Sequence, residues 1–206
     1  MSWWDRRVLP FLVEKACRTG SIRRERERRV PQASGRVLEI GVGTGLNLAF
    51  YDPSRVTELV AIDPAPALLE RARARAGECR APLQLLPASA TALPFDAGSF
   101  ESVVMTYTLC SVDDPGRALA EMRRVLGPGG RLLFVEHGRS PRTVTRAVQR
   151  ALTPGWRRIS GNCHLDRDVP RSLREAGFRL DELDEHAGDG PSWAGHTFEG
   201  VAVVDG

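Results

Sequence analysis

A glycine-rich loop after a short apolar run constrains this chain more than any other feature. Val37 to Ile40 is predicted to form a buried strand, and the loop after it carries glycines in Gly-x-Gly-x-Gly spacing at Gly41, Gly43 and Gly45. Glycine adopts a positive φ without strain and lets a ligand approach the backbone closely. We expect a helix from Leu46 to Phe50, whose first N–H groups would face a polar ligand.

Two acidic residues flank the loop. Glu39 precedes it, where a carboxylate would repel a pyrophosphate but attract an ammonium group. Asp63 closes the next apolar run, where a carboxylate can accept two hydrogen bonds from a ribose diol. NAD enzymes use the same acid, so Asp63 alone does not choose between ligands. The missing Gly-x-Gly-x-x-Gly spacing argues against a dinucleotide. Together these features favour a sulfonium cofactor derived from methionine.

Apolar runs alternate with helix-like segments through the middle of the chain. The predicted strands are 37–40, 59–62, 83–86, 100–105 and 132–135, with later ones at 178–183 and 197–203 that can form an antiparallel pair. The predicted helices are 65–76, one that begins at Asp114-Pro115 and ends before Gly127, and 167–176. This alternation predicts an α/β fold, a doubly wound parallel sheet covered by helices on both faces.

Composition excludes several classes of protein. The net charge is +3 across 206 residues, which is too small for a dedicated nucleic-acid binder. The four cysteines stand far apart and without zinc-finger spacing, so we expect free thiols and no metal. No apolar run approaches the roughly 20 residues that span a bilayer. With no signal peptide recognised, these features favour a cytoplasmic protein.

Two longer segments resemble the class I S-adenosylmethionine-dependent methyltransferases. The segments are 88–100, ASATALPFDAGSF, and 121–130, EMRRVLGPGG, both similar to the ubiquinone and menaquinone methyltransferase group. The resemblance implies a seven-stranded Rossmann-like sheet in the order 3-2-1-4-5-7-6, with the last strand antiparallel. Ser89 stands where the family often has an acid for the adenine amino group, so Ser89 or the Ala90 backbone would serve. The predicted cofactor residues are Glu39, Gly41, Gly43, Gly45, Asn47, Asp63, Pro64, Ser89, Ala90 and Thr106.

A closer resemblance concerns the methyl acceptor. The segments TLCSV (108–112), FVEH (134–137) and GNCHL (161–165) are similar to the membrane-associated alkyl-thiol methyltransferases and their bacterial relatives. This implies a small, hydrophobic acceptor, with a thiol first and a phospholipid amine or a quinone-type ring as alternatives. His137, His164 and Tyr107 are the candidate catalytic residues, either histidine as a base and Tyr107 as a wall beside the methyl group. Two other functions remain as hypotheses: a cofactor-binding module without catalysis, and an NAD-linked oxidoreductase.

The first 35 residues form an Arg-rich lead that we separate from the methyltransferase domain at 36–206. Its apolar residues, which include Trp3, Trp4 and Phe11, alternate with arginines, and Glu25 and Glu27 interrupt the arginine run. We expect a helical lid or cap that packs on the domain. A peripheral membrane contact is the second interpretation, weakened by those interleaved acids. The sequence does not indicate an oligomeric state.

Overall fold

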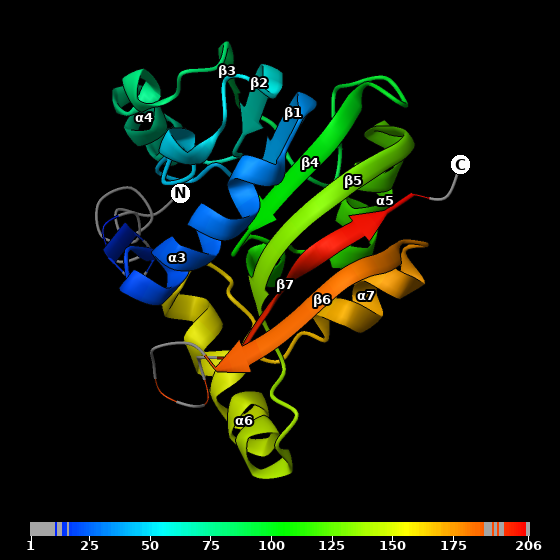
Figure 1. The fold of residues 1–206 in the computed structure, drawn as a ribbon. Helices are drawn as coiled ribbons and strands as arrows, with labels where there is room; N and C mark the ends of the chain where they lie inside the picture. The colour runs from blue at the N-terminus through cyan, green and yellow to red at the C-terminus, as the bar shows by residue number, and fades with distance from the viewer. Residues whose placement is uncertain are drawn as a thin grey trace.

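A computed structural model describes residues 11, 14–15, 17–187, 191, 193 and 196–204. Its centre is one sheet of seven strands in the order β3-β2-β1-β4-β5-β7-β6 (Figure 1). The strands are β1 (Gly35–Ile40), β2 (Val56–Ile62), β3 (Leu83–Leu86), β4 (Phe100–Thr106), β5 (Leu126–His137), β6 (Arg179–Ala187) and β7 (His196–Val203). Strands β1 to β5 pair in parallel, and β7 runs antiparallel to both β5 and β6. The predicted fold class, strand order and antiparallel final strand are confirmed.

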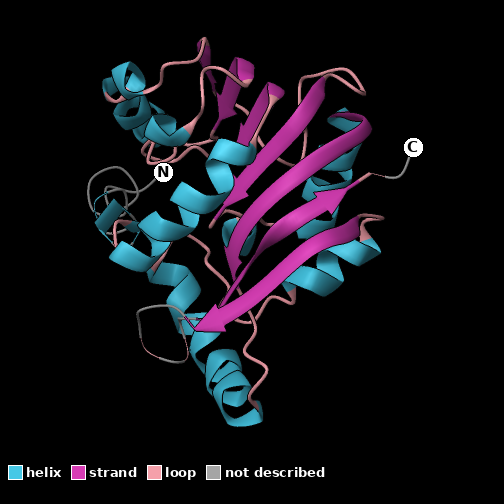
Figure 2. Ribbon diagram, in the orientation of Figure 1, coloured by secondary structure: helices cyan, strands magenta, loops and turns pink. Residues whose placement is uncertain are grey.

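Helices cover both faces of the sheet (Figure 2). On one face, α4 (Pro66–Ala74) packs Leu69 and Ala72 against apolar side chains of β1 and β2. On the other, α5 (Pro115–Val125) and α7 (Val169–Glu175) contribute a second cluster that includes Leu119, Met122 and Leu173. These two clusters bury the central strands β1, β2 and β4 on both sides, which explains the apolar runs in their sequences, whereas the edge strand β6 is polar and mostly exposed.

The order of strands reverses beside β1, where β2 lies on one side and β4 on the other. Chain connections leave β1 toward opposite halves of the sheet there, which opens a crevice beyond the carboxyl ends of these strands. The glycine loop follows β1, Asp63 follows β2 and Tyr107 follows β4. The topology therefore brings the predicted ligand-binding residues to one edge of the sheet.

The structure corrects two sequence-based predictions about helices. No α-helix follows the glycine loop: residues 43–47 form turns, and only a 3-10 helix at Leu48–Phe50 follows. Three positive-φ glycines and an early Asp52-Pro53 leave too few residues for helical hydrogen bonds to propagate. The second correction is α6 (Thr143–Ile159), a helix of 17 residues in a region where no helix was predicted. Its apolar side chains are spaced among arginines and an internal Pro154, which hides the helical period.

The described part of the Arg-rich lead packs on the sheet. Helix α3 (Gly20–Arg29) lies across the face of the sheet in Figure 1. Arg28 donates to Glu199 of β7, and Arg29 pairs with Glu182 and Asp184 of β6. Arg29 and Glu199 are buried, while Arg28, Glu182 and Asp184 are at least half exposed, so these ion pairs join α3 to the sheet and are only partly shielded from solvent. No helix in the described residues is long and apolar enough to cross a membrane.

Candidate active site

A cavity of about 700 Å³ opens at the carboxyl ends of β1, β2 and β4. Its floor is formed by the loops after these strands, and part of its roof comes from the N-terminal lead through Cys17 and Arg26. The far wall is the segment after α6, which contributes Ser160, Gly161 and Asn162. All but one of the predicted cofactor residues line this cavity. The residues that line it are Glu39, Gly41, Gly43, Asn47, Asp63, Pro64, Ser89, Ala90 and Thr106.

The exception is Gly45, which faces away from the cavity. A Cβ atom at this position would lie 3.0 Å from Leu48 and 3.1 Å from the backbone of Ala72 in α4. Gly45 therefore allows the loop to pack closely on the helix, and its positive φ of 83° closes the turn. The spacing of the motif cannot separate this packing role from ligand contact.

The other two glycines of the motif differ in what surrounds them. At Gly41 a Cβ atom would lie 2.5 Å from the Thr108 side chain, so the loop and the segment after β4 are in tight contact. At Gly43 a Cβ atom would meet only the Gly41 carbonyl at 3.9 Å, and the residue lines the cavity. The backbone at Gly43 thus borders open space that a ligand can fill.

Replacing Gly41 with alanine is expected to destabilise the protein by about 2–4 kcal/mol, because strain at a φ of 70° adds to overlap with Thr108. Gly129 is the matched control: its φ is 72°, but a Cβ atom there meets nothing within 4 Å. Gly129→Ala should therefore show the strain alone. Urea unfolding of both variants measures the difference, and equal losses would contradict the packing role given to Gly41.

Glu39 is buried below the cavity and held by two donors. Asn47 Nδ2 donates to it at 2.9 Å, and so does the Tyr51 hydroxyl at 2.9 Å. Burial raises the pKa of Glu39 to about 7, although both hydrogen bonds oppose the shift. Asn47 also donates to Thr106, while its own Oδ1 is buried without a partner. Among the cavity-lining residues, Asn47 therefore presents an acceptor that a bound amino group can satisfy.

A cation lies at the same end of the cavity. Arg26 of α3 donates from Nη1 to the Cys17 carbonyl at 2.6 Å, and its Nε atom is buried without a partner. Its charge lowers the pKa of Glu39, which shows that the two groups interact. A carboxylate and a guanidinium that line the same cavity are complementary to the ammonium and carboxylate of an amino acid. The residues present therefore fit the methionyl end of S-adenosylmethionine.

Cofactor affinity is expected to weaken by roughly tenfold as the pH falls from 8 to 6, because a protonated Glu39 no longer attracts an ammonium group. Calorimetric titration with S-adenosylhomocysteine at each pH measures this, and Glu39→Gln should remove the dependence. The same shift affects folding with the opposite sign. The Glu39 contribution is complete below about pH 4.5 and is lost as the pH rises through about 7. A pH-independent affinity in the wild-type protein would contradict the role of Glu39.

Asp63 and Ser89 occupy the other end of the cavity. Asp63 accepts from the backbone N–H of Gly43 at 3.0 Å and of Ala65 at 2.8 Å, one on each oxygen. Each carboxylate oxygen accepts more than one hydrogen bond, so both retain capacity for a ribose diol. The Ser89 hydroxyl lies 2.9 Å from that of Thr91 and also accepts from the Thr91 backbone. Its capacity toward a ligand is correspondingly smaller.

Tyr107 has the least common backbone conformation at the site. Its φ is +52°, a region that residues other than glycine rarely adopt and that often marks functional positions. The residue lines the cavity, and its hydroxyl donates to the buried carboxylate of Glu25. The other oxygen of Glu25 lies 2.8 Å from His186 Nε2, and the His186 side chain is 34% exposed. Hydrogen bonds therefore link Tyr107, a cavity-lining residue, through Glu25 to the partly exposed His186.

The structure does not bring the two candidate histidines to the cavity. His137 Nε2 lies 3.0 Å from the Cys163 sulfur, behind the residues that form the wall. His164 Nδ1 lies 3.1 Å from the Cys110 carbonyl and 3.0 Å from Arg167. Their ring nitrogens thus face protein groups, and neither is among the described residues that line the cavity. We do not retain either histidine as the base.

Sequence reasoning missed several residues of the site. Arg26 and Glu25 lie in an arginine run whose charges have no distinguishing pattern. His186 lies on β6 beyond the predicted strand 178–183, and 161 residues separate it from its partner Glu25. Tyr51 follows the loop without a recognisable motif. The only signal that pointed to this region was the expectation that the N-terminal lead covers the domain.

The strand order and this cavity are typical of α/β proteins that bind a nucleoside-containing ligand. Comparison with known proteins gives the class of this protein. Residues 38–134 match a family model described as a methyltransferase domain. The chain is 34% identical over 176 residues to demethylmenaquinone methyltransferase of Thermus thermophilus, covering 82% of this chain and 72% of that protein. The chain therefore belongs to the S-adenosylmethionine-dependent methyltransferases.

A second relative is thiol S-methyltransferase TMT1B of Homo sapiens, 37% identical over 153 residues. The alignment covers 71% of this chain, which spans only 62% of the length of that relative. Among solved structures, a SAM dependent methyltransferase from Aquifex aeolicus has a TM-score of 0.65 at 17% identity, covering 95% of this chain and 98% of that one. This last similarity concerns the fold alone.

Proposed function

We propose that this protein transfers a methyl group from S-adenosylmethionine to the sulfur of a small, hydrophobic thiol. The observation that carries the proposal is the hydroxyl of Tyr107, which connects a residue of the cavity wall to the buried carboxylate of Glu25. The 37% identity to a thiol S-methyltransferase supports the choice of acceptor. A thiol must lose its proton when its sulfur is methylated, and the hydrogen-bonded pair of Tyr107 and Glu25 can accept that proton.

Each half of the cavity has a distinct task in holding the cofactor. Glu39, Asn47 and Arg26 would bind its amino-acid end, and the Gly43 backbone and Asp63 would bind the ribose. Pro64, Ser89 and Ala90 would border the adenine. When bound, the cofactor supplies a methyl group on a sulfonium, which is a good leaving group. The chain itself aligns the acceptor and excludes competing nucleophiles.

Tyr107 and Glu25 then handle the proton of the acceptor. As the acceptor loses its S–H proton to the Tyr107 oxygen, the Tyr107 O–H proton moves to Glu25 Oε2. Burial and the neighbouring carboxylate raise the pKa of Tyr107, so a free tyrosinate is not formed and the two transfers are coupled. Rotation of the protonated Glu25 carboxyl would bring this proton to the partly exposed His186, which lies on the other oxygen and can pass the proton to solvent.

An acceptor panel tests the proposal. Purified protein with methyl-labelled cofactor should label an alkyl thiol, with mass spectrometry locating the methyl group on sulfur. A quinol and a phosphatidylethanolamine dispersion are included because ring carbon and phospholipid nitrogen are the alternative acceptors. Exclusive labelling of either would overturn the choice of a thiol. Tight cofactor binding with no transfer to any acceptor would instead favour a binding module without catalysis.

A further inference from the structure

Two cysteines and a histidine meet directly behind the far wall of the cavity. Cys110 lies in the 3-10 turn after β4, His137 ends β5, and Cys163 follows α6. Their two sulfur atoms and the imidazole nitrogen all lie within 4.8 Å of one another. Cys110 is buried, and the other two are partly buried. The three residues are separated by 26 or more positions, so no spacing motif reveals them.

The surrounding backbone holds these three side chains in place. The His164 N–H donates to the Cys110 carbonyl at 2.9 Å, and Arg167 donates to the carbonyls of Leu109 and Val112. These bonds fasten the segment after α6 to the turn after β4. Beneath them Glu136 is fully buried, with one oxygen on the N–H groups of Thr108 and Leu109 and the other without a partner. The cluster is therefore preorganised by its neighbours.

We propose that Cys110, His137 and Cys163 bind one zinc ion, with water in the fourth position. Thiolate sulfur and imidazole nitrogen are the donors zinc prefers, and zinc–ligand distances of about 2.0–2.3 Å place tetrahedral donors roughly 3.3–3.8 Å apart. The observed separations run from 3.0 Å between His137 Nε2 and Cys163 Sγ to at most 4.8 Å, so they bracket that geometry and need only small shifts in either direction to reach it. Magnesium and calcium prefer oxygen donors and do not suit this set. Two thiolates neutralise the charge of the ion.

The ion would join three loops that shape the acceptor end of the cavity. Ser111, next to Cys110, and Asn162, next to Cys163, both line the cavity wall. Binding would therefore fix this wall, a role that does not depend on which acceptor is methylated. The prediction of no metal from cysteine spacing would then be wrong for a physical reason: the ligands come from three separate parts of the fold.

Cobalt substitution tests this site. Reduced, metal-free protein titrated with Co²⁺ should develop sulfur-to-cobalt charge-transfer absorption that saturates at one equivalent and is displaced by Zn²⁺. Cys110→Ser and Cys163→Ser should each lose most of it, and circular dichroism reports whether they fold. Cys79→Ser, at a half-buried thiol outside the cluster, should leave it unchanged. Absence of the absorption in folded, fully reduced wild-type protein would overturn the proposal, as would equal loss in the Cys79 variant.

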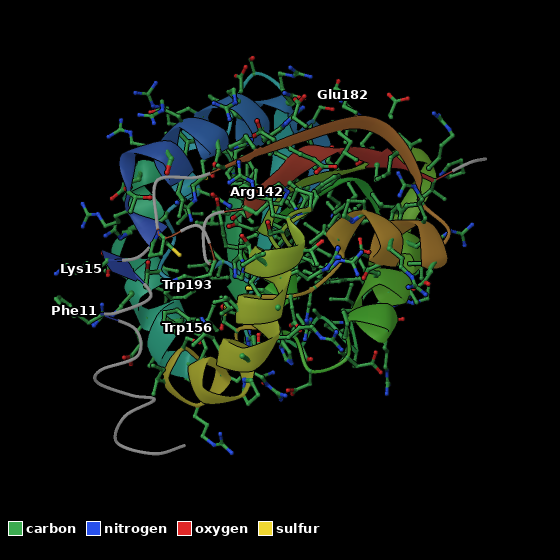
Figure 3. The ribbon with its side chains drawn as sticks, turned by 90° about the horizontal axis from the view of Figure 1, so that it is seen from below. Phe11, Lys15, Arg142, Trp156, Glu182 and Trp193 are labelled. Carbon is green, nitrogen blue, oxygen red and sulfur yellow. The ribbon has the colours of Figure 1, made fainter. Side chains whose placement is uncertain are left out.

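Helix α6 has an exposed apolar surface. Four of the five exposed large hydrophobic residues in the described chain lie on this helix: Val144, Val148, Leu152 and Ile159. The first three follow each other at four-residue spacing and so form one stripe. Gln149 and Thr153, about 100° further round the helix from Val148 and Leu152, are buried and hold α6 on the domain. In Figure 1, α6 projects beyond the end of the sheet, and Figure 3 shows Trp156 and Trp193 beside one another, with ring centroids 5.6 Å apart.

The charged residues around this stripe are all basic. Residues 138–165 contain six arginines and no acidic residue. In the described structure, only Arg139 of these six forms an ion pair with an acid, Asp168. Exposed apolar side chains flanked by cations without acidic partners complement an anionic lipid surface, where the stripe enters the interface and the arginines meet headgroups.

We infer that α6 docks this protein on anionic membranes. The segment that follows α6 lines the cavity through Ser160, Gly161 and Asn162, so docking would place the acceptor side near the lipid. This assigns the membrane contact to α6 instead of the N-terminal lead, for which it was the second interpretation of the sequence after a lid or cap. The described part of that lead has buried Arg26 and Arg29 and packs on the sheet.

Vesicle sedimentation tests the docking surface. Wild-type protein should bind vesicles containing phosphatidylglycerol at least tenfold more than vesicles of phosphatidylcholine alone. A Val148→Glu, Leu152→Glu double variant should lose this binding, and Arg174→Gln, on the exposed surface of α7, should retain it. Unchanged binding by the α6 variant would overturn the inference, especially if removal of residues 1–12 abolished it. So would a dimer that the α6 variant dissociates, because the stripe would then be a protein interface.

Discussion

Asp63→Asn is expected to reduce cofactor affinity by at least about 100-fold, because it removes the charge that strengthens both hydrogen bonds to a ribose diol. The amide also creates a local conflict. Gly43 and Ala65 each donate a backbone N–H to one carboxylate oxygen, so an NH₂ group on either side would face a donor. The glycine loop would have to shift, and its contact with the cofactor would be lost together with the diol.

Calorimetric titration with S-adenosylhomocysteine measures this effect without requiring an acceptor. Asp181→Asn provides the control, since Asp181 lies exposed on β6 and pairs only with Arg179. Its affinity should match that of the wild type. If Asp63→Asn bound the ligand within about threefold of the wild type, the ribose assignment would be wrong even though the cavity remained.

Tyr107→Phe is expected to lower kcat for an alkyl thiol by about 30-fold at pH 7. A thiol with a pKa of about 8.5 is only about 3% ionised at that pH, and the relay supplies the missing deprotonation. The deficit should shrink as the pH approaches 9, where the thiolate forms without help. The KM for the cofactor should change little, because Tyr107 holds no predicted cofactor contact.

Two further variants separate this relay from a packing effect. Glu25→Gln keeps a side chain of the same shape beside Tyr107 but cannot accept the proton, so it should reproduce the pH-dependent loss. His186→Gln should lower the rate less, because solvent can exchange with a partly exposed position. A Tyr107→Phe deficit that is constant from pH 7 to 9 would indicate lost positioning and would contradict proton transfer.

The sheet and the cofactor half of the site could be predicted because their determinants are local. A strand that is buried on both faces must be apolar along its length, as at β1 and β2, and the glycine loop follows directly in the chain. Glu39 and Asp63 lie at the ends of those strands, where topology decides their position. Gly45 differs from the other predicted cofactor residues in that it does not line the cavity and packs closely against Ala72.

The acceptor half could not be predicted in the same way because its groups meet only in the folded chain. Glu25 reaches Tyr107 across 82 residues, and His137 reaches Cys163 across 26. A histidine at the end of a strand suggested a base, yet its orientation depends on the sulfur beside it. Helix α6 was missed because arginines separate its apolar residues and Pro154 interrupts the segment, although Val144, Val148 and Leu152 recur at four-residue spacing.

A crystal structure with bound S-adenosylhomocysteine tests the central claim most directly. We expect the ribose hydroxyls on Asp63, the amino-acid end beside Glu39 and Arg26, and the sulfur facing the Tyr107 side of the cavity. That arrangement would leave space for an acceptor between the sulfur and Tyr107. A ligand bound outside this cavity, or one whose sulfur faces away from Tyr107, would contradict the assignment of cofactor and acceptor sites.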